Sequence, residues 1–445
     1  MSSSTTEYLA QPNAPPALNI PSGDTVSVKL IDSTAELQAP LSHLMGPSIP
    51  GHDYIRCPAL AFLIEHKSGR KTLFDLGSRK DPENFAPFIL KLITQPGWGA
   101  AAKKDVAEIL EENGVATASI EAVFWSHWHY DHIGNMQTFP GSTKLIVGPG
   151  FKDAFTPGYP KNKNSPVLES DWEGRELIEL SFDGDLKLGG FQALDYFGDG
   201  SFYLLDAPGH AIGHICALAR VTGDGDDTFI FMGGDACHHG GEWKPNQYLP
   251  LPRVLNPSPL RTGGVCPGAL FEKLHRDQSA TKEFYVLAAN FSHEHSQAEQ
   301  TIHYLQEFDA APNVLCLIAH DTAVLDPAAG VPFFPHGTLN KWKKNRIDEK
   351  IRWSFLKDFA DAVDRGVRQS DISTMEAGLP TPADTADLFE RICQDEINRR
   401  DRLKLANEAR AKTASIYFQT IQKAEGAIKD IASIDPKHWG RAGAY

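Results

Sequence analysis

The stretch Ser126-His127-Trp128-His129-Tyr130-Asp131-His132 decides how this chain is interpreted. The run Ile120 to Trp125 before it is apolar and β-prone, which predicts a strand that delivers the cluster to its end. Side chains alternate along an extended segment, so His127 and His129 point to the same side, and a following turn presents the rest from another direction. Three imidazoles and a carboxylate at this spacing predict a metal site that can hold two ions.

The pattern His127-x-His129-x-Asp131-His132 resembles the signature of the metallo-β-lactamase superfamily of metal-dependent hydrolases. The family's other motifs follow in its order within Thr25 to Leu356: a strand-end Asp-x-Gly, a third histidine, a bridging aspartate and a last histidine. They match Asp75-Leu76-Gly77, Ala207-Pro208-Gly209-His210, Gly234-Asp235 and Ile318-Ala319-His320. The resemblance implies an α/β fold, the four-layer αβ/βα sandwich, with the site at one edge of its two sheets.

The same resemblance implies two cations and assigns their ligands. One cation receives His127, His129 and His210, the other Asp131, His132 and His320, and both share Asp235. Two zinc ions suit these donors, with iron, manganese and cobalt as alternatives. Asp75 is expected to brace the ligand loops by hydrogen bonds without binding metal. His214 is a ligand candidate by residue type, but the resemblance gives that role to His210 and leaves His214 a structural one.

The implied chemistry is hydrolysis by attack of a metal-bound hydroxide, with Asp131 or Asp235 carrying the proton to the leaving group. The chain departs from quorum-quenching lactonases at His238. Those enzymes carry a tyrosine three positions after the bridging aspartate, where it donates a hydrogen bond to the substrate carbonyl. We expect His238 to replace this donor, and the alternative is a surface position in the turn. The candidate catalytic residues are therefore Asp131, Asp235 and His238.

The substrate is also suggested by resemblance. The chain, including Phe334 to Trp342, is similar to fungal members of the lactonase-like branch, among them metallo-lactamases that open 2-benzoxazolinone. This implies opening of a small cyclic amide, carbamate or ester. The alternatives are an N-acyl homoserine lactonase, a glyoxalase II-like thioesterase, which Pro208 to Cys216 resembles, and a mononuclear-iron persulfide dioxygenase. An interaction protein with a vestigial site is the non-enzyme alternative, and the complete ligand set argues against it.

The amino-acid composition and net charge limit which binding partners and cellular locations are expected. The 445 residues, 41% of them hydrophobic and 22% charged, are typical of a soluble protein with a large core. The net charge of -14 argues against nucleic acid and anionic membrane as partners and favours a small neutral substrate. The six cysteines have no paired spacing, which indicates reduced thiols, and we find neither a secretion signal nor an apolar run of membrane-spanning length. A cytoplasmic location is expected.

Three parts are expected along the chain. Residues 1–24 are rich in Ser, Thr, Pro and Ala and predict a flexible arm, and residues 25–357 form the catalytic domain. Residues 358–445 predict an appended helical extension. There, apolar residues from Tyr417 to Ile431 at spacings of three and four make a seam for another helix, or for a partner subunit in a homodimer.

Four local predictions concern the surroundings of the site. Apolar residues at helical spacing, followed by Gly114, predict a helix over about 99–113. The partly apolar loop Ala39 to Pro58 forms a wall of a substrate pocket or merely caps the core. Proline density predicts that Gly240 to Pro267 is a stiff lid without regular structure. Ser292 to His295 is expected to be a loop that starts a helix.

Overall fold

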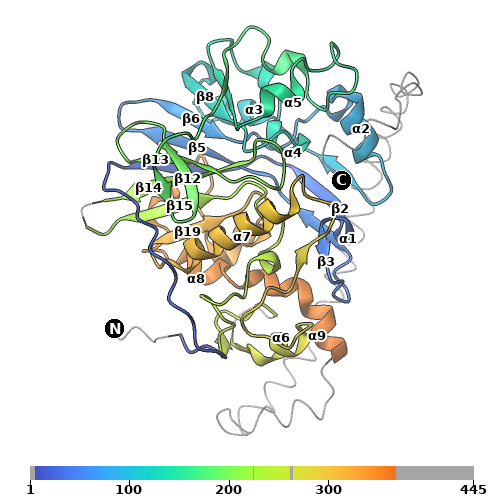
Figure 1. Ribbon diagram of the computed structural model, residues 1–445, viewed down its shortest axis with the longest axis vertical. Helices are drawn as coiled ribbons and strands as arrows, with labels where there is room; N and C mark the ends of the chain where they lie inside the picture. Colours follow the sequence, from blue (N-terminus) through green and yellow to red (C-terminus); the bar gives the residue numbers. More distant parts are fainter. Residues whose placement is uncertain (1–5, 224, 261–263, 367–445) are drawn as a thin grey trace, which may run out of the picture. The chain divides into compact units, whose positions relative to one another are not determined.

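A computed structural model describes residues 6–223, 225–260 and 264–366, which contain two six-stranded sheets. The first sheet has, in spatial order, β1 (Val26–Asp32), β5 (Leu60–His66), β6 (Lys71–Phe74), β8 (Ile120–Phe124), β9 (Lys144–Val147) and β10 (Leu177–Glu179). The second has β11 (Lys187–Leu188), β12 (Phe191–Asp195), β13 (Phe202–Asp206), β14 (Ile215–Thr222), β15 (Thr228–Met232) and β19 (Val314–Leu317). Figure 1 shows the strands of the first sheet above those of the second, with the helices around them.

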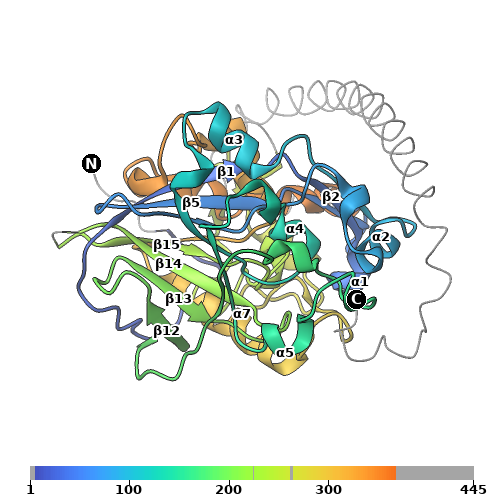
Figure 2. The ribbon, with the colours of Figure 1, turned by 90° about the horizontal axis from the view of Figure 1, so that it is seen from above.

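The two sheets pack face to face because alternate side chains of each are apolar. Val28 and Phe124 of the first sheet share one buried cluster with Leu204 and Ile230 of the second. The other face of the second sheet is covered by α7 (His295–Ala310), whose buried Phe308 packs against it. Figure 2 shows α3 on the outer side of the first sheet and α7 on the outer side of the second. The expected four-layer αβ/βα sandwich is confirmed.

The helices are α1 (Leu41–Leu44), α2 (Pro87–Ile93), α3 (Val106–Glu112), α4 (Tyr130–Ile133), α5 (Phe151–Phe155), α6 (Ala269–Leu274), α7, α8 (Ile347–Ile351) and α9 (Ala360–Gly366). The helix predicted over 99–113 is too long at its start, because Asp105 caps α3 in a capping box with Glu108. The residues Gly99–Ala101 form a strand, β7, in place of the first predicted turn. The helix start expected near Ser292 to His295 is confirmed at α7.

Smaller sheets lie beside the sandwich. β7 joins β2 (Glu36–Pro40) and β4 (Tyr54–Cys57) in a three-stranded sheet of order β4-β2-β7. The two remaining pairs are β3 (Met45–Gly46) with β18 (Val286–Leu287), and β16 (Val254–Leu255) with β17 (Cys266–Pro267). The segment Gly240 to Pro267 therefore contains short strands that its proline content did not predict.

Strand direction brings the sequence motifs to one edge of the sandwich. β6 and β8 are parallel neighbours in the first sheet, as are β15 and β19 in the second. β13 runs in the direction of β15, because both are antiparallel to the strand between them. The loops that carry the five motifs thus follow strands that end at the same side, which is the arrangement that a shared site requires.

The structure describes most of the predicted arm but only the first residues of the predicted extension. The composition of residues 1–24 predicts a flexible arm, but the described part is fixed by backbone hydrogen bonds such as Leu9 N–H to the Leu251 carbonyl at 2.9 Å. Leu18 and Ile20 also pack against the cluster beneath α7. Of two compact units in the chain, the one that reaches Ala362 holds both sheets. The helical extension and its proposed dimer seam lie outside the described residues, apart from the first few of them.

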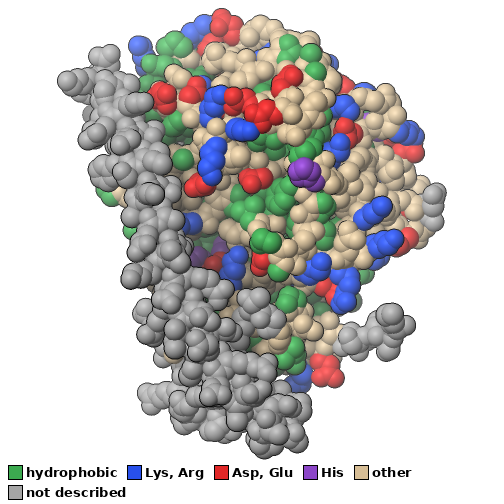
Figure 3. All heavy atoms as spheres, turned by 180° about the vertical axis from the view of Figure 1, so that it is seen from behind, with side chains coloured by type: hydrophobic (Ala, Val, Ile, Leu, Met, Phe, Trp, Pro, Cys, Tyr) green, Lys and Arg blue, Asp and Glu red, His purple; other side chains and the backbone are tan. Residues whose placement is uncertain are grey.

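No helix among the described residues is long and apolar enough to cross a membrane. On the face drawn in Figure 3, basic and acidic side chains are interspersed between apolar ones without a field of one sign.

Candidate metal centre

The loop after β8 is held from behind by Asp75, which follows β6. Its Oδ1 accepts the backbone N–H of Ser126 at 2.6 Å, and its Oδ2 accepts from Nδ1 of His132 at 2.8 Å. Asp75 adopts a left-handed backbone with φ of 61°, which aspartate tolerates better than most residues. The carboxylate therefore directs Nε2 of His132 into the centre, and Asp75 has the bracing geometry predicted for it.

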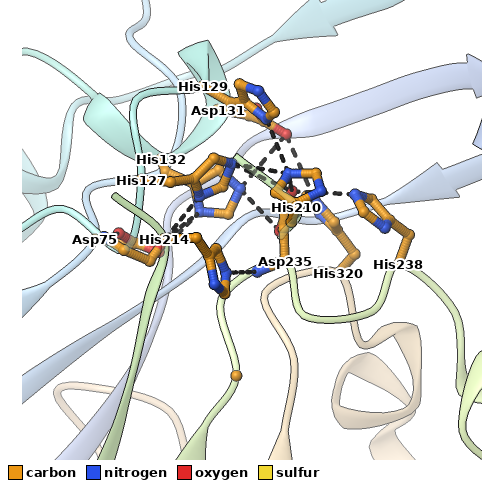
Figure 4. Close-up of polar contacts among 12 residues, drawn as sticks. Asp75, His127, His129, Asp131, His132, His210, His214, Asp235, His238 and His320 are labelled. Atoms are coloured by element: carbon orange, nitrogen blue, oxygen red, sulfur yellow. Dashed lines mark hydrogen bonds and ion pairs between the residues drawn. The ribbon is translucent and has the colours of Figure 1, made fainter. Parts of the chain in front are cut away.

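Three histidine rings converge on one point of this centre (Figure 4). Nε2 of His210 lies 3.2 Å from Nε2 of His127 and 3.1 Å from Nδ1 of His129. Burial is the main cause that lowers the pKa of all three rings well below the ordinary value. Neutral imidazoles whose nitrogens point at one another have facing lone pairs, and such a set is a donor group for a divalent cation.

A second group forms around Asp131, His132 and His320. Nε2 of His320 lies 3.5 Å from Asp131 Oδ2 and 3.1 Å from Asp235 Oδ1, while its Nδ1 donates to the Pro58 carbonyl at 2.7 Å. Burial alone would lower the pKa of both rings. Asp235, Asp75 and Asp131 instead raise the pKa of His132 well above the ordinary value, and Asp235 and Cys57 do the same for His320. A cation would replace the protons that these carboxylates attract.

Asp235 stands between the two groups. Its Oδ2 is 3.6 Å from Nε2 of both His127 and His210, whereas its Oδ1 is 3.0 Å from Nε2 of His132. In each group the candidate ligand atoms all lie within 4.8 Å of one another. His132 Nε2 and Asp235 Oδ1 are buried and lack hydrogen-bond partners among the described residues. The donor set fits two divalent cations that share one carboxylate.

Close packing explains the residues around Asp235. A Cβ on Gly234, whose φ is +51°, would lie 2.9 Å from Ser126 Cβ and 3.0 Å from His214 Nε2. His214 donates from Nδ1 to the Ala207 carbonyl at 2.8 Å and accepts the Asp235 backbone N–H at Nε2, 3.1 Å away. Both of its nitrogens are used, so His214 fixes the position of Asp235 and has no free atom for a metal.

His238 faces the centre and is not the exposed turn residue of the alternative interpretation. Its side chain is buried, and Nε2 lies 3.3 Å from Asp235 Oδ2. The ring packs edge-on against Phe291, with centroids 4.9 Å apart. His238 is therefore in place to contact a substrate bound beside Asp235.

A pocket opens over the two groups. Its lining consists of Leu37, Gln38, Ala39, Leu44, Ile55, Cys57, Trp98, His129, Tyr130, Asp131, Asp235, His238, Phe291 and His320. The wall opposite the ligands comes largely from β2 and β4 of the small sheet, so the expectation that Ala39 to Pro58 forms a pocket wall is confirmed. Among the residues that the structure describes, neither a lysine nor an arginine lines this pocket. The lid expected from Gly240 to Pro267 is wrong, since no described residue of that segment lines this pocket.

Some pocket residues carry no signal in the sequence. Trp98 precedes β7 and Phe291 precedes α7, and both are ordinary apolar residues in loops. Only the pairing of β7 with β2 brings Trp98 to the pocket. The helix predicted over 99–113 gave no reason to expect Trp98 in the pocket. The Asp-x-x-Glu pattern that starts at Asp105 marks where the helix really begins.

A second buried histidine cluster, His52 with His239 and Asp358, lies behind the loop that carries His238. Nδ1 of His239 accepts the Gly241 backbone N–H at 3.0 Å, so the neutral ring carries its hydrogen on Nε2, 3.2 Å from Asp358 Oδ2. Nδ1 of His52 is hydrogen-bonded to the Tyr285 hydroxyl at 2.7 Å. His239 has no lone pair left for a metal, and hydrogen bonds account for this cluster.

Comparison with known proteins agrees with this geometry. The metallo-beta-lactamase superfamily profile matches residues 54–233. A metallo-hydrolase of Annulohypoxylon moriforme is 44% identical over 358 residues, 79% of this chain and 92% of that protein. A gamma-lactamase of Fusarium pseudograminearum is 42% identical over 357 residues, 78% of this chain and 85% of that protein. A solved quorum-quenching N-acyl homoserine lactone lactonase has a TM-score of 0.45 at 15% identity, covering 71% of this chain and 99% of its own.

The fold, the histidine and aspartate clusters at the strand ends and these relatives define a metal-dependent hydrolase. The chain belongs to the metallo-beta-lactamase superfamily.

Proposed function

We propose that this chain is a binuclear zinc hydrolase that opens a small, neutral cyclic amide, carbamate or ester such as 2-benzoxazolinone. The observation that carries the proposal is the pocket: a largely apolar wall faces the two ligand groups, and the described residues of its lining include no lysine or arginine. A charged group of a substrate that lay against the apolar wall, away from the metal ligands, would be desolvated without a partner, which is costly. A flat neutral ring loses little on entering and gains from burial against Trp98 and Ile55.

The names of relatives support a lactam substrate. Besides the protein of Fusarium pseudograminearum, a gamma-lactamase of Gibberella moniliformis is 51% identical over 216 residues, which are 48% of this chain and 90% of that protein. The lactam is therefore our first candidate for this chain. The lactone is the second, because an ester in the same ring presents the same carbonyl to the same pocket.

Two divalent cations, when bound, supply a Lewis acid for the substrate carbonyl and lower the pKa of a water. The carboxylates of Asp131 and Asp235 are the groups placed to take the proton from the attacking water. The same carboxylates are placed to pass that proton to the leaving atom of the ring, and His238, whose Nε2 lies 3.3 Å from Asp235 Oδ2, is placed to donate a hydrogen bond to the substrate carbonyl. The apolar wall of the pocket excludes water from the opposite side of the substrate.

The experiment compares three substrates with the zinc-loaded protein and with a chelator-treated control. We expect 2-benzoxazolinone to give 2-aminophenol, measured by chromatography, only when zinc is present. S-lactoylglutathione is an anionic thioester and is expected to react at least about 100-fold more slowly, since the pocket lining offers no counter-charge. Oxygen uptake with glutathione persulfide is expected to stay at background.

Any of three other outcomes would replace the proposed function with a different one. Thioester hydrolysis at the higher rate would make the chain a glyoxalase II-like enzyme, and oxygen consumption with iron would make it a persulfide dioxygenase. Hydrolysis of homoserine lactones with 2-benzoxazolinone untouched would leave a lactonase and contradict the lactam.

A further inference from the structure

A second hollow opens over the first group of metal ligands, and the chemistry proposed above does not use it. Its lining includes the ligands His129 and His210 together with Trp128, Ile212, Phe291 and His293. Two of these residues, His129 and Phe291, also line the substrate pocket. A substrate whose carbonyl lies over the metal ligands therefore has this second hollow beside it.

Phe291 forms the partition between the pocket and the second hollow. Its ring centroid lies 4.9 Å from that of His238, which belongs to the pocket lining, and 5.4 Å from that of His210, which belongs to the hollow. The loop that carries Phe291 is fixed to the ligand loop, because the backbone N–H of His293 donates to the His210 carbonyl at 3.0 Å. The two spaces are therefore neighbours with a wall in a defined position between them.

His293 provides the hydrogen-bonding group of the second hollow. Its ring is half-buried, and no described residue forms a hydrogen bond or an ion pair with it. A neutral imidazole donates one hydrogen bond and accepts another, so both capacities are left for a bound molecule. Trp128 and Ile212 add apolar surface around this one polar group.

The size of the second hollow limits what it can hold. Its volume is about 10 Å³, against about 40 Å³ for the substrate pocket. A space of this size holds a group of about one or two heavy atoms, comparable to a single water molecule. A hydroxyl group suits it, because a hydroxyl both donates and accepts as the imidazole does. A methyl group of the same size would desolvate the ring without offering a partner.

We infer that the second hollow is a substrate subsite, in which the His293 ring hydrogen-bonds a hydroxyl group on the atom next to the scissile carbonyl. The inference rests on the proposed function and narrows its substrates to α-hydroxy lactams and lactones. The position of the hydroxyl follows from His129, which lines both spaces. The carbonyl lies over the metal ligands, so a substituent on the adjacent atom is the one that lies beside them too.

Binding is tested with oxindole, an aryl lactam, and with its 3-hydroxy and 3-methyl derivatives, which carry the substituent next to the carbonyl. Each compound is titrated into the zinc-loaded protein by isothermal calorimetry. The wild type should bind 3-hydroxyoxindole about five- to tenfold more tightly than 3-methyloxindole, as expected for one hydrogen bond between neutral groups. In His293→Ala the two compounds should bind within about twofold of each other.

Two further variants separate the subsite from general effects on the fold. His295→Ala is the matched control, because this nearby histidine lies in α7 with its Nε2 3.4 Å from Glu299 Oε1, outside both linings. It should keep the full preference for the hydroxyl. Ile212→Phe fills the hollow and keeps His293, so both 3-substituted compounds should weaken about tenfold relative to oxindole. The melting temperature of each variant shows whether it is folded.

Kinetics connect the subsite to ring opening. The substrates are 3-hydroxy-2-coumaranone and 3-methyl-2-coumaranone, two aryl lactones that differ in the same way as the oxindoles. In the wild type and in His295→Ala, kcat/KM should be about five- to tenfold higher for the hydroxy compound. In His293→Ala this ratio should fall to within about twofold of one.

The outcomes decide between the subsite and its alternatives. Equal binding of the hydroxy and methyl compounds by the wild type would overturn the inference. A preference that persists in His293→Ala would show that the hydroxyl binds the zinc ions and would also overturn it, as would loss of the preference in His295→Ala. If calorimetry gives the expected preferences but no lactam or lactone is opened, the proposed function fails and the subsite stands.

Discussion

Two buried clusters of histidine and aspartate adjoin the loop that carries His238 and His239, and they differ in how their ring nitrogens are hydrogen-bonded. In the candidate metal centre, Nε2 of His132 lies 3.0 Å from Asp235 Oδ1 without a hydrogen bond to any described residue, and the nitrogens of His127 and His210 face each other at 3.2 Å. In the cluster around His239, a backbone N–H and a carboxylate occupy both ring nitrogens. Composition alone does not distinguish them, but hydrogen bonding does.

The difference also assigns a purpose to each cluster. Converging lone pairs without hydrogen bonds are unfavourable in a buried site unless a cation balances them. A cluster whose nitrogens are all hydrogen-bonded does not need a cation, and its hydrogen bonds instead connect segments of the chain. Here His52, His239 and Asp358 connect three distant segments, and Tyr285 adds a fourth.

The largest effect is expected when the ligand shared by both metal groups is removed. Asp235→Ala removes the carboxylate that both metal groups use, so kcat for the lactam should fall at least about 1,000-fold and zinc content should drop. His239→Gln, in the satisfied cluster, should keep kcat within about threefold and keep its zinc. Kinetics and metal analysis of both variants decide this, and a comparable loss in His239→Gln would refute the distinction.

A smaller effect is expected from the residue behind the centre. Asp75→Ala removes the acceptor of His132 Nδ1–H and of the Ser126 N–H, which loosens the ligand loop. Zinc affinity should fall about 10- to 100-fold in a chelator competition assay. Asp358→Asn, which removes the corresponding acceptor of His239, should leave zinc affinity unaltered. Equal affinities in Asp75→Ala and the wild type would contradict the bracing role.

The hydrogen-bonded cluster of His52, His239 and Asp358 should affect how the stability of the protein depends on pH. Burial, reinforced by His239, lowers the pKa of His52 from 6.5 to about 4. The unfolded chain therefore binds more protons than the folded one between these values, and the wild type loses stability as the pH falls through that window. The loss attributable to His52 is about 2 to 3 kcal/mol between pH 7 and pH 4.5.

His52→Gln cannot take up this proton, so its free energy of unfolding should fall less with acid than that of the wild type. Urea titrations of both proteins at pH 7 and pH 4.5, all with chelator present, measure the difference. A stability gap between the two proteins that is the same at both pH values would show that His52 is not a buried neutral ring.

The sequence predicted most of the sandwich and all seven candidate ligands that the structure brings together. Metal sites of this kind can be recognised in a sequence because their ligands lie in short motifs at strand ends, such as Ser126 to His132. Gly234 is a further signal, because no side chain fits at its position. The family resemblance then supplied the distant partners, from Asp75 to His320. The bracing position of Asp75 was predicted in the same way.

What the sequence did not predict depends on contacts between distant segments. Glu242 appears as an unremarkable acid in a proline-rich segment until its hydrogen bonds to the backbone N–H groups of His238 and His239 are seen. That segment was predicted to be a lid, yet part of it pairs instead with residues near Leu9. Trp98 reaches the pocket only through a strand pairing that helical periodicity obscured.

The most direct test of the account is the number of zinc ions bound per chain, counted by native mass spectrometry of the zinc-loaded protein. We predict two ions in the wild type and in His239→Gln, and fewer than two in Asp235→Ala. Two ions would agree with a centre confined to the unsatisfied cluster. A single ion in the wild type would contradict the shared carboxylate, and a third ion that disappears in His239→Gln would contradict the distinction between the two clusters.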